Sequence, residues 1–363
     1  MILDRRGFVA AGSAALLSGC ATTGSRQDSS ACSALPKVHV DQSRIIRTVA
    51  GLRPYRASGF VVRRDQFGER ALVHNYGHGG AGITLSWGSS RLATNLGLQG
   101  HSGAVAIVGA GVMGLTTARL VQEAGYPVVL YTAALPPETT SAAAGGQISP
   151  FGHFSEDAVT PEWRAQFAAA MAYSWSRFQI MAGEKYGIRW LPTYEESRRT
   201  EPTATESFLP DWRVLSQSEH PFQLDDVVRY RTMYVETPRF LRQLTADVLT
   251  AGGRIQLRNF ASAGELMALP EKLIFNCTGI GARALFGDTD LYPVRGQLAV
   301  LIPQPEVLYA AAGGWGYMFP RPDGILLGGT FERNVWEASP VPATISRIVR
   351  SHRRFFDGFR CAA

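Results

Sequence analysis

The sequence predicts a mixed α/β fold of two domains, one with a parallel sheet and one with an antiparallel sheet. The pattern Gly-x-Gly-x-x-Gly at Gly109–Gly114 follows the apolar run Val105–Val108 and opens the helical pattern Val112–Ala124. Strand, glycine turn and helix in this order begin a Rossmann-type dinucleotide-binding unit. From Gln297 to Phe331, short apolar segments alternate with Gly and Pro, which is typical of an antiparallel sheet.

Elements are also expected before the glycine motif. Strands over Gly59–Arg64 and Ala71–His74 are separated by the turn-like stretch Asp65–Gly68, and the apolar spacing of Gly82–Leu96 predicts a helix. The glycine-rich stretch Gly97–Gly103 predicts a flexible join to the strand at Val105.

After the motif, helix signals and apolar runs define the remaining elements. Gly125 is placed to end the first helix. Thr237 is the expected N-cap of a later helix, with Pro238 at its first position. The further expected elements are the strand Pro127–Tyr131, a long helix Pro161–Tyr186 with an aromatic stripe for core packing, the helix Thr237–Leu249, the strands Arg254–Leu257 and Leu273–Asn276, and a last helix Ala343–Phe356.

The charge pattern argues against a nucleic-acid-binding protein. The chain has 363 residues and a net charge of +6, with 45% hydrophobic residues. Its arginine pairs, at 5–6, 63–64, 198–199 and 353–354, are isolated, so we interpret them as solvated faces rather than a basic stripe. No apolar run approaches the ~18 residues of a membrane-spanning helix.

Residues 1–20 are expected to be a signal rather than part of the fold. Asp4–Val9 resembles a twin-arginine export signal, and Leu17–Cys20, after a short apolar core, resembles a lipobox cut before a lipidated Cys20. An unstructured alanine-rich N-terminus is the alternative. Residues 21–43, rich in Ser, Thr and Ala, predict a tether. We therefore expect export of a folded protein to the periplasm or cell envelope, with membrane attachment only through a lipid on Cys20.

The glycine motif and the segments around it resemble the D-amino-acid oxidase family of FAD-dependent oxidoreductases. In that family the motif lies at the N-terminus, whereas here Gly51–Arg56 and His74–Thr84, which resemble the family's C-terminal end, precede it. The resemblance therefore implies a circularly permuted chain, joined at Gly97–Gly103. The segments Thr139–Gln147, Asn276–Gly279 and Arg295–Gln297 also match the family, in family order.

The resemblance implies FAD as the cofactor. One departure concerns the ribose, because the second strand ends at Tyr131–Ala134 without an acidic residue, and Glu138 lies beyond two prolines. Ribose binding must then use another group. For Phe260 a place in the core is the alternative to a place at the adenine. The cofactor-binding residues implied by the resemblance are Gly109, Gly111, Gly114, Thr139, Thr140, Ala144, Gly145, Phe260, Thr278, Gly79, Gly82, Ile83 and Thr84.

Three residues are implied to act on the substrate. Arg53 matches the family arginine that binds the substrate carboxylate through two hydrogen bonds, and Tyr317 matches the tyrosine that assists it. Gly80 matches the glycine whose carbonyl accepts from the substrate amine. The alternatives are that Arg53 is a surface arginine and that Tyr317 is a half-buried strand tyrosine without a role at the substrate. His74 and His78 have a metal-ligand spacing, but the glycines around them favour a loop and no third ligand is evident, so no metal is expected.

The lid of the site is expected to differ from the family. A second tyrosine lies four residues before the first in the family, and Gly313 occupies that position here. Trp315, in the same glycine-rich loop, is a candidate to close the pocket instead. Substrate size and product release depend on this loop.

The implied reaction is the oxidative deamination of a D-amino acid by hydride transfer to flavin N5, giving a keto acid, ammonia and hydrogen peroxide. A glycine- or sarcosine-type amine oxidase, a quinone-linked D-amino-acid dehydrogenase and a non-catalytic ligand-binding lipoprotein are the alternatives. The sequence leaves the oligomeric state open. The expected domains are the signal 1–20, the tether 21–43, the FAD-binding domain 44–150 and 237–290, the substrate domain 151–236 and 291–342, and the C-terminal helix 343–363.

The permutation also bears on the cysteines. Cys277 follows an apolar strand and is expected to be buried, while Cys20 would carry lipid. In an unpermuted relative the chain would run from the region of Cys361 into the region before Ile45, so these ends should lie close together. We predict a Cys32–Cys361 disulfide in an oxidising compartment, with two free thiols as the alternative.

Overall fold

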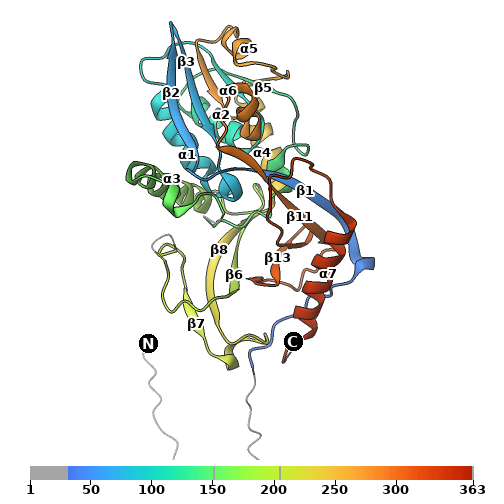
Figure 1. The fold of residues 1–363 in the computed structure, drawn as a ribbon. Coiled ribbons are helices and arrows are strands. Elements are labelled where there is room, and N and C mark those ends of the chain that lie inside the picture. The colour runs from blue at the N-terminus through green and yellow to red at the C-terminus, as the bar shows by residue number, and fades with distance from the viewer. Residues whose placement is uncertain (1–31, 150–151, 204–205, 362–363) are drawn as a thin grey trace, which may run out of the picture. The chain divides into compact units, whose positions relative to one another are not determined.

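Two β-sheets organise the protein in a computed structural model, which describes residues 32–149, 152–203 and 206–361 (Figure 1). In the first sheet all strands except the edge strand β2 run parallel. In order, this sheet comprises β2 (Val61–Phe67), β3 (Arg70–Tyr76), β10 (Leu273–Asn276), β4 (Val105–Val108), β5 (Val128–Thr132) and β9 (Arg254–Leu257).

The second sheet has nine strands and is mostly antiparallel. Strand β1 pairs with β11 along its length, from Ile45 opposite Leu301 to Arg56 opposite Leu291. In order, this sheet comprises β1 (Ile45–Arg56), β11 (Leu291–Leu301), β14 (Gly324–Gly328), β13 (Gly316–Arg321), β12 (Ala310–Gly313), β6 (Ile188–Glu196), β8 (Val227–Val235) and β7 (Arg213–Leu215), with β15 (Glu332–Arg333) paired to β11. The predicted α/β class, with one parallel and one antiparallel sheet, is confirmed.

Helices cover both sheets. Near the parallel sheet lie α1 (Gly82–Gly97), α2 (Val112–Glu123) and α4 (Thr237–Thr250), and α7 (Pro342–Asp357) packs on β11 and β13 (Figure 1). The remaining helices are α3 (Pro161–Ile180), which packs on α1, and the short α5 (Ala263–Met267) and α6 (Ala282–Phe286). The short 3₁₀ segments are η1 (Gln42–Arg44), η2 (Gly79–Ala81), η3 (Thr140–Ala143), η4 (Glu156–Ala158), η5 (Gln217–Glu219) and η6 (Gly279–Gly281).

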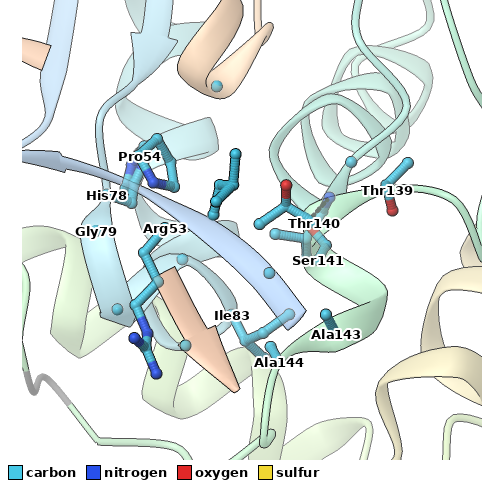
Figure 2. Close-up of a pocket in the computed structure, with 18 of the residues that line it drawn as sticks. Arg53, Pro54, His78, Gly79, Ile83, Thr139, Thr140, Ser141, Ala143 and Ala144 are labelled. Carbon is cyan, nitrogen blue, oxygen red and sulfur yellow. Dashed lines mark hydrogen bonds between the residues drawn. The ribbon is translucent and has the colours of Figure 1, made fainter. Parts of the chain in front are cut away.

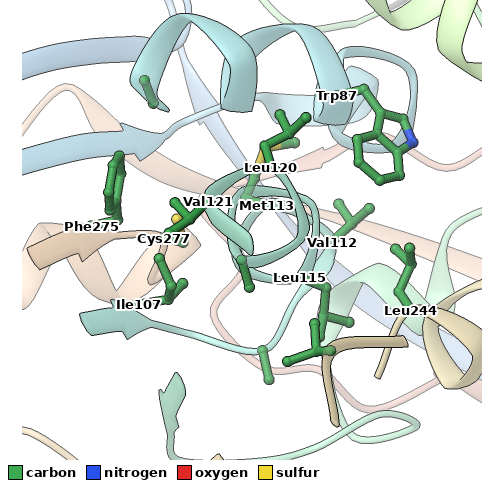
Figure 3. Packing of buried hydrophobic residues seen from close by; sticks show 14 of the residues in the cluster. Trp87, Ile107, Val112, Met113, Leu115, Leu120, Val121, Leu244, Phe275 and Cys277 are labelled. Atoms are coloured by element: carbon green, nitrogen blue, oxygen red, sulfur yellow. The ribbon is translucent and has the colours of Figure 1, made fainter. Parts of the chain in front are cut away.

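The largest core surrounds α2. In Figure 3, Leu115, Leu120 and Val121 of this helix point outward in different directions into buried side chains. A helix that is apolar on most sides is stable only when it is covered on most sides. The strand β4 beneath it is fully buried, as expected for a parallel strand covered on both faces. This core fixes the start of α2 against the end of β4.

Some predicted boundaries were wrong. The long helix ends at Ile180 rather than Tyr186, because Gly183, at φ +136°, turns the chain into a bridge with Ile188. Thr237 is the first residue of α4 rather than its N-cap, which is Glu236. The Thr237 hydroxyl instead donates to the carbonyls of Ala142 and Ala144, at 3.0 and 3.2 Å.

Two of the cysteine predictions are confirmed, and the one for Cys20 lies outside the described residues. Cys32 and Cys361 form a disulfide, with their Cα atoms 6.2 Å apart. Cys277 is buried, and burial raises the pKa of its thiol to about 12. The expected signal and residues 21–31 of the expected tether lie outside the described residues. Residues 32–43 are described, and Val38 and Val40 among them are buried in a core of the fold, so this part packs on the protein rather than forming a free tether. In the part of the chain that the structure describes, no helix is long and apolar enough to cross a membrane.

Candidate active site

A cavity of about 1210 Å³ lies at the carboxyl ends of the parallel strands. Gly77, Gly109, Thr132, Arg258 and Cys277 line it, and each directly follows or ends one of the strands β3, β4, β5, β9 and β10. Ligands of open parallel sheets bind at this edge. The parallel sheet therefore delivers five chain segments to one cavity.

The predicted glycine motif forms a tight turn at the wall of this cavity. Gly109 has φ +109°, and a Cβ added there would overlap the carbonyl oxygen of Cys277. A Cβ on Gly114 would overlap the carbonyl oxygen of Gly109. Helix α2 then begins at Val112 with no acidic residue in its first turn, so its amide groups and partial positive charge can act on an anion.

A second loop faces this helix start. The Ser141 hydroxyl accepts a hydrogen bond from the Val112 amide at 3.0 Å. The Thr139 hydroxyl oxygen is buried and has no hydrogen-bond partner among the described residues. Figure 2 shows Thr139 to Ser141 across the cavity from Arg53. The Thr139 hydroxyl has no partner, and the loop that carries it faces a helix N-terminus without acidic residues in its first turn. Both features fit the pyrophosphate of a dinucleotide.

The expectation that no acidic residue is available after β5 was wrong. Glu138, which we excluded, lines the cavity with Thr132, because the chain turns back through a hydrogen bond from the Glu138 amide to the Leu135 carbonyl at 2.9 Å. An acidic residue is therefore available near the end of β5. Phe260 also lines the cavity, with the Arg258 guanidinium 4.6 Å from its ring centre.

A second helix start reaches the cavity from the other side. The segment from Gly79 through η2 leads into α1, which has no acidic residue in its first turn. The Gly80 amide donates to the Gly152 carbonyl at 2.9 Å, which fixes this segment. Gly79, at φ +51°, approaches Gly152 and His153 too closely for a side chain. Backbone groups thus form this wall.

Arg53 and Tyr317 come together on the antiparallel sheet. A Cβ on Gly296 would overlap the Arg53 guanidinium, so this side chain lies flat over β11. Its Nη1 donates to the Thr330 carbonyl at 3.1 Å. In the same way the Tyr317 ring lies over Gly328 of β14. Burial raises the pKa of Tyr317 and the charge of Arg53 opposes this, so the hydroxyl stays protonated and can donate.

Most predicted site residues reach this one cavity, while two do not line it. Gly114 supports the turn from beneath Gly109. The Thr84 hydroxyl donates to the Ser149 carbonyl at 2.8 Å. The predicted residues that line the cavity are Arg53, Tyr317, Gly80, Gly109, Gly111, Thr139, Thr140, Ala144, Gly145, Phe260, Thr278, Gly79, Gly82 and Ile83.

Trp315 does not close the pocket. Its ring stacks on Phe355 of α7, with 3.9 Å between ring centres, and it is not part of the cavity wall. The amphipathic α7 offers this apolar contact, which the loop sequence alone did not reveal. Gly313 and Gly314 line the cavity instead.

Residues of β6 and β8 reach the cavity without having been predicted. Glu195 and Glu196 end β6, and Tyr230 lies on β8. The Tyr230 hydroxyl donates to Glu195 Oε2 at 2.9 Å. Burial raises the pKa of Glu195 despite this hydrogen bond. No motif marks these residues in the sequence, because their place depends on the pairing of β6 with β12.

The two histidines have structural partners. His74 Nε2 lies 3.1 Å from Asp65, and His78 Nε2 lies 2.9 Å from the Ser89 hydroxyl. Across the ranges that the structure describes, no group of three or more His, Cys, Asp or Glu side chains is arranged to hold a metal ion.

His78 leads to a pH prediction. Burial lowers its pKa from 6.5 to about 3, so below pH 6.5 the unfolded chain binds a proton that the folded chain does not. The free energy of unfolding should therefore fall as the pH is lowered from 6.5 toward 3, by up to about 1.4 kcal/mol per pH unit from this residue. His78→Gln should make urea-unfolding energies less dependent on pH. Substitution of the exposed His39 by Gln is the control, and equal slopes for wild type and His78→Gln would contradict the prediction.

Comparison with known sequences finds a family model that matches most of the chain. The model of the family described as FAD dependent oxidoreductase matches residues 9–96 and 104–362. A D-amino-acid oxidase of Streptomyces coelicolor is 32% identical over 280 residues, covering 72% of this chain and 78% of that protein. A D-amino-acid oxidase of Rubrobacter xylanophilus is 30% identical, covering 67% and 74%.

A solved structure shares the fold. A glycine oxidase of Geobacillus kaustophilus superposes with a TM-score of 0.53 at 16% identity, covering 72% of this chain and 81% of that chain. At this identity the likeness concerns the fold alone.

Proposed function

Because the chain belongs to the D-amino-acid oxidase family of FAD-dependent oxidoreductases, we propose that it oxidatively deaminates D-amino acids. Its cofactor is FAD, and the glycine turn, the Thr139 hydroxyl and the two acid-free helix starts fit the dinucleotide. The observation that carries the proposal is the convergence of Arg53 and Tyr317 on the cavity that the glycine motif also lines.

In the proposed site the residues act mainly by positioning. The Arg53 guanidinium binds the substrate carboxylate and the Tyr317 hydroxyl donates to the same group. The Gly80 carbonyl accepts from the substrate amine and so orients Cα. FAD, when bound, takes up the two electrons and hydrogen that the Cα–N unit loses. Holding the substrate in one geometry supplies much of the rate enhancement, and no general base is required of the chain.

The products follow from this oxidation. Loss of two electrons and two protons from the amine gives an imino acid, which water hydrolyses to a keto acid and ammonia. Transfer of the electrons to oxygen gives hydrogen peroxide. The test is anaerobic bleaching of the purified flavoprotein by a panel of D-amino acids, with L-enantiomers as controls. Bleaching by no D-amino acid would overturn the proposal; bleaching without oxygen uptake in air would instead identify another electron acceptor, such as a quinone.

We further propose a division of labour and a circular permutation. The parallel sheet would hold FAD and the antiparallel sheet the substrate. The family match is interrupted between residues 96 and 104, where the glycine-rich join was expected, and the disulfide brings Cys32 and Cys361 together. A rearranged chain that starts at residue 104 and joins position 361 to 32 should fold and bind FAD, and failure to do so would count against the permutation.

Export is the last part of the proposal. The twin-arginine-like segment and Cys20 support a lipoprotein of the periplasm or cell envelope. A disulfide between Cys32 and Cys361 is consistent with an oxidising compartment. Replacement of Arg5 and Arg6 by Lys should hold the protein in the cytoplasm, and Cys20→Ser should release it from membranes. Unchanged fractionation of both variants would contradict this.

A further inference from the structure

We propose that the substrates are D-amino acids with a positively charged side chain, which Glu195 and Glu196 recognise; this inference rests on the function proposed above. It assigns a specificity role to the acidic end of the cavity, defined here as these two glutamates. Both line the cavity that Arg53 and Tyr317 line.

The pairing of the strands sets the distance between the acidic end of the cavity and the end that holds Arg53 and Tyr317. Glu195 pairs with Ala312, Ala312 with Tyr317, and Tyr317 with Gly328, so they form one row across four strands. Paired residues project from the same face, and neighbouring strands lie about 4.7–4.9 Å apart. The Cα atoms of Glu195 and Tyr317 are thus about 10 Å apart. Glu196, the next residue of β6, projects from the other face and reaches the cavity at its exposed rim, at the end of the strand.

The path between these ends is open because its residues are small. Tyr317 leans over Gly328 of β14, toward the side of the sheet where β1 carries Arg53, and away from Ala312 of β12. We call Arg53 and Tyr317 together the carboxylate clamp. Three small residues line the cavity between this clamp and the glutamates, namely Ala312, Gly313 and Gly314. A tyrosine at Gly313 would stand directly against Glu196, because even a Cβ there lies 2.6 Å from Glu196 Oε2.

The acidic end carries more negative than positive charge. Glu195 accepts from Arg199 at 3.2 Å, but Arg199 also pairs with Glu206 and does not line the cavity. Glu196 accepts from the Gly314 amide at 2.8 Å, and no cationic side chain of the described residues forms an ion pair with it. The cationic residues of the cavity wall are Arg53, at the clamp, and Arg258, beside Phe260.

Opposite charges at the two ends match a ligand with opposite charges at its two ends. An α-carboxylate on Arg53 leaves a long side chain free to cross Ala312, and an ammonium or guanidinium at its tip would meet the glutamates. A neutral side chain would leave Glu196 without a cationic partner, while an anionic side chain would be repelled by both carboxylates. The site therefore favours lysine-like and arginine-like D-amino acids.

A binding experiment tests the acidic end without catalysis. 6-Aminohexanoate and hexanoate differ only in a terminal ammonium, and neither has an α-amine to oxidise. Perturbation of the flavin absorbance of the holoenzyme should give an affinity about tenfold higher for 6-aminohexanoate. Glu196→Gln should bring this ratio close to one, while Glu306→Gln, which removes an exposed glutamate outside the cavity, should not change it. Equal affinities in the wild type would overturn the inference.

An oxidation experiment separates this inference from the proposed function. D-Lysine should exceed D-norleucine in kcat/KM by about tenfold or more, and Glu196→Gln should remove the advantage. Glu196 is exposed, so Glu196→Lys should still fold. This variant should shift the substrate preference from D-lysine toward D-glutamate. Equal oxidation of D-lysine and D-norleucine would overturn the specificity and leave the oxidase standing. Oxidation of no D-amino acid would overturn the function itself.

Discussion

Arg53→Ala is expected to lower kcat/KM for D-amino acids by at least about thirtyfold. The guanidinium is half-buried, lies flat over Gly296 and is held by the Thr330 carbonyl, so it is prepared to form two hydrogen bonds with a carboxylate. Loss of a charge-assisted pair in such a place costs about 2–5 kcal/mol. Because about 1.36 kcal/mol corresponds to a factor of ten, even the lower figure gives a thirtyfold loss.

Steady-state oxygen uptake would measure this effect, with matched variants as controls. Arg53→Lys keeps the charge but not the planar pair of donors, so it should fall between wild type and Arg53→Ala. Arg47→Ala removes an exposed arginine from the same strand, where it pairs with Asp323 at 3.0 Å, and should change kcat/KM little. If Arg53→Ala kept the specificity constant of the wild type, the carboxylate clamp would be wrong.

Gly114→Ala is expected to give the largest loss of stability, about 4 kcal/mol or more. Its Cβ would overlap the carbonyl oxygen of Gly109, and the Cα that carries this Cβ and the Gly109 oxygen both belong to backbone that the core around α2 holds in place. Side-chain rotation cannot relieve such an overlap, so the glycine turn must open. The purified variant should contain little FAD, measured as the ratio of flavin to protein absorbance.

A second glycine in a helix serves as the control, because it separates the steric overlap at Gly114 from the general effect of replacing a helical glycine by alanine. Gly264, in the short helix α5, would bring an added Cβ near only the Ser262 hydroxyl, at 3.6 Å. Gly264→Ala should therefore keep wild-type FAD content and unfold in urea at or above the wild-type midpoint. Normal FAD content in Gly114→Ala would show that the turn does not depend on this close packing.

The glycine turn and the loop that faces it could be predicted from the sequence because their signals are local. The apolar strand, glycine turn and helix at residues 105–124 fix their own geometry, and positive φ at Gly109 requires a residue without Cβ. The loop from Thr139 reaches the same cavity for a related reason, since small residues allow close backbone approach. Helix α7, predicted over 343–356, differs by one residue at each end from the observed Pro342–Asp357.

The acidic end could not be predicted, because it depends on strand pairing between distant segments. Glu195 reaches the clamp only through the pairing of β6 with β12, more than 100 residues later in the chain. Trp315 failed as a lid for a similar reason, since its stacking partner Phe355 lies on α7. Glu138 was not expected near the ribose because two prolines precede it. The turn that returns the chain to the cavity after these prolines could not be predicted from the sequence.

The bond between Cys32 and Cys361 closes residues 32–361 into one covalent ring. A protease that cuts one loop between these positions opens the ring without dividing the molecule, and the non-covalent contacts around the break can persist. Electrophoresis would then reveal such a cut only after reduction. In the proposed exported location, where proteases are present, single cuts would accumulate without loss of either half.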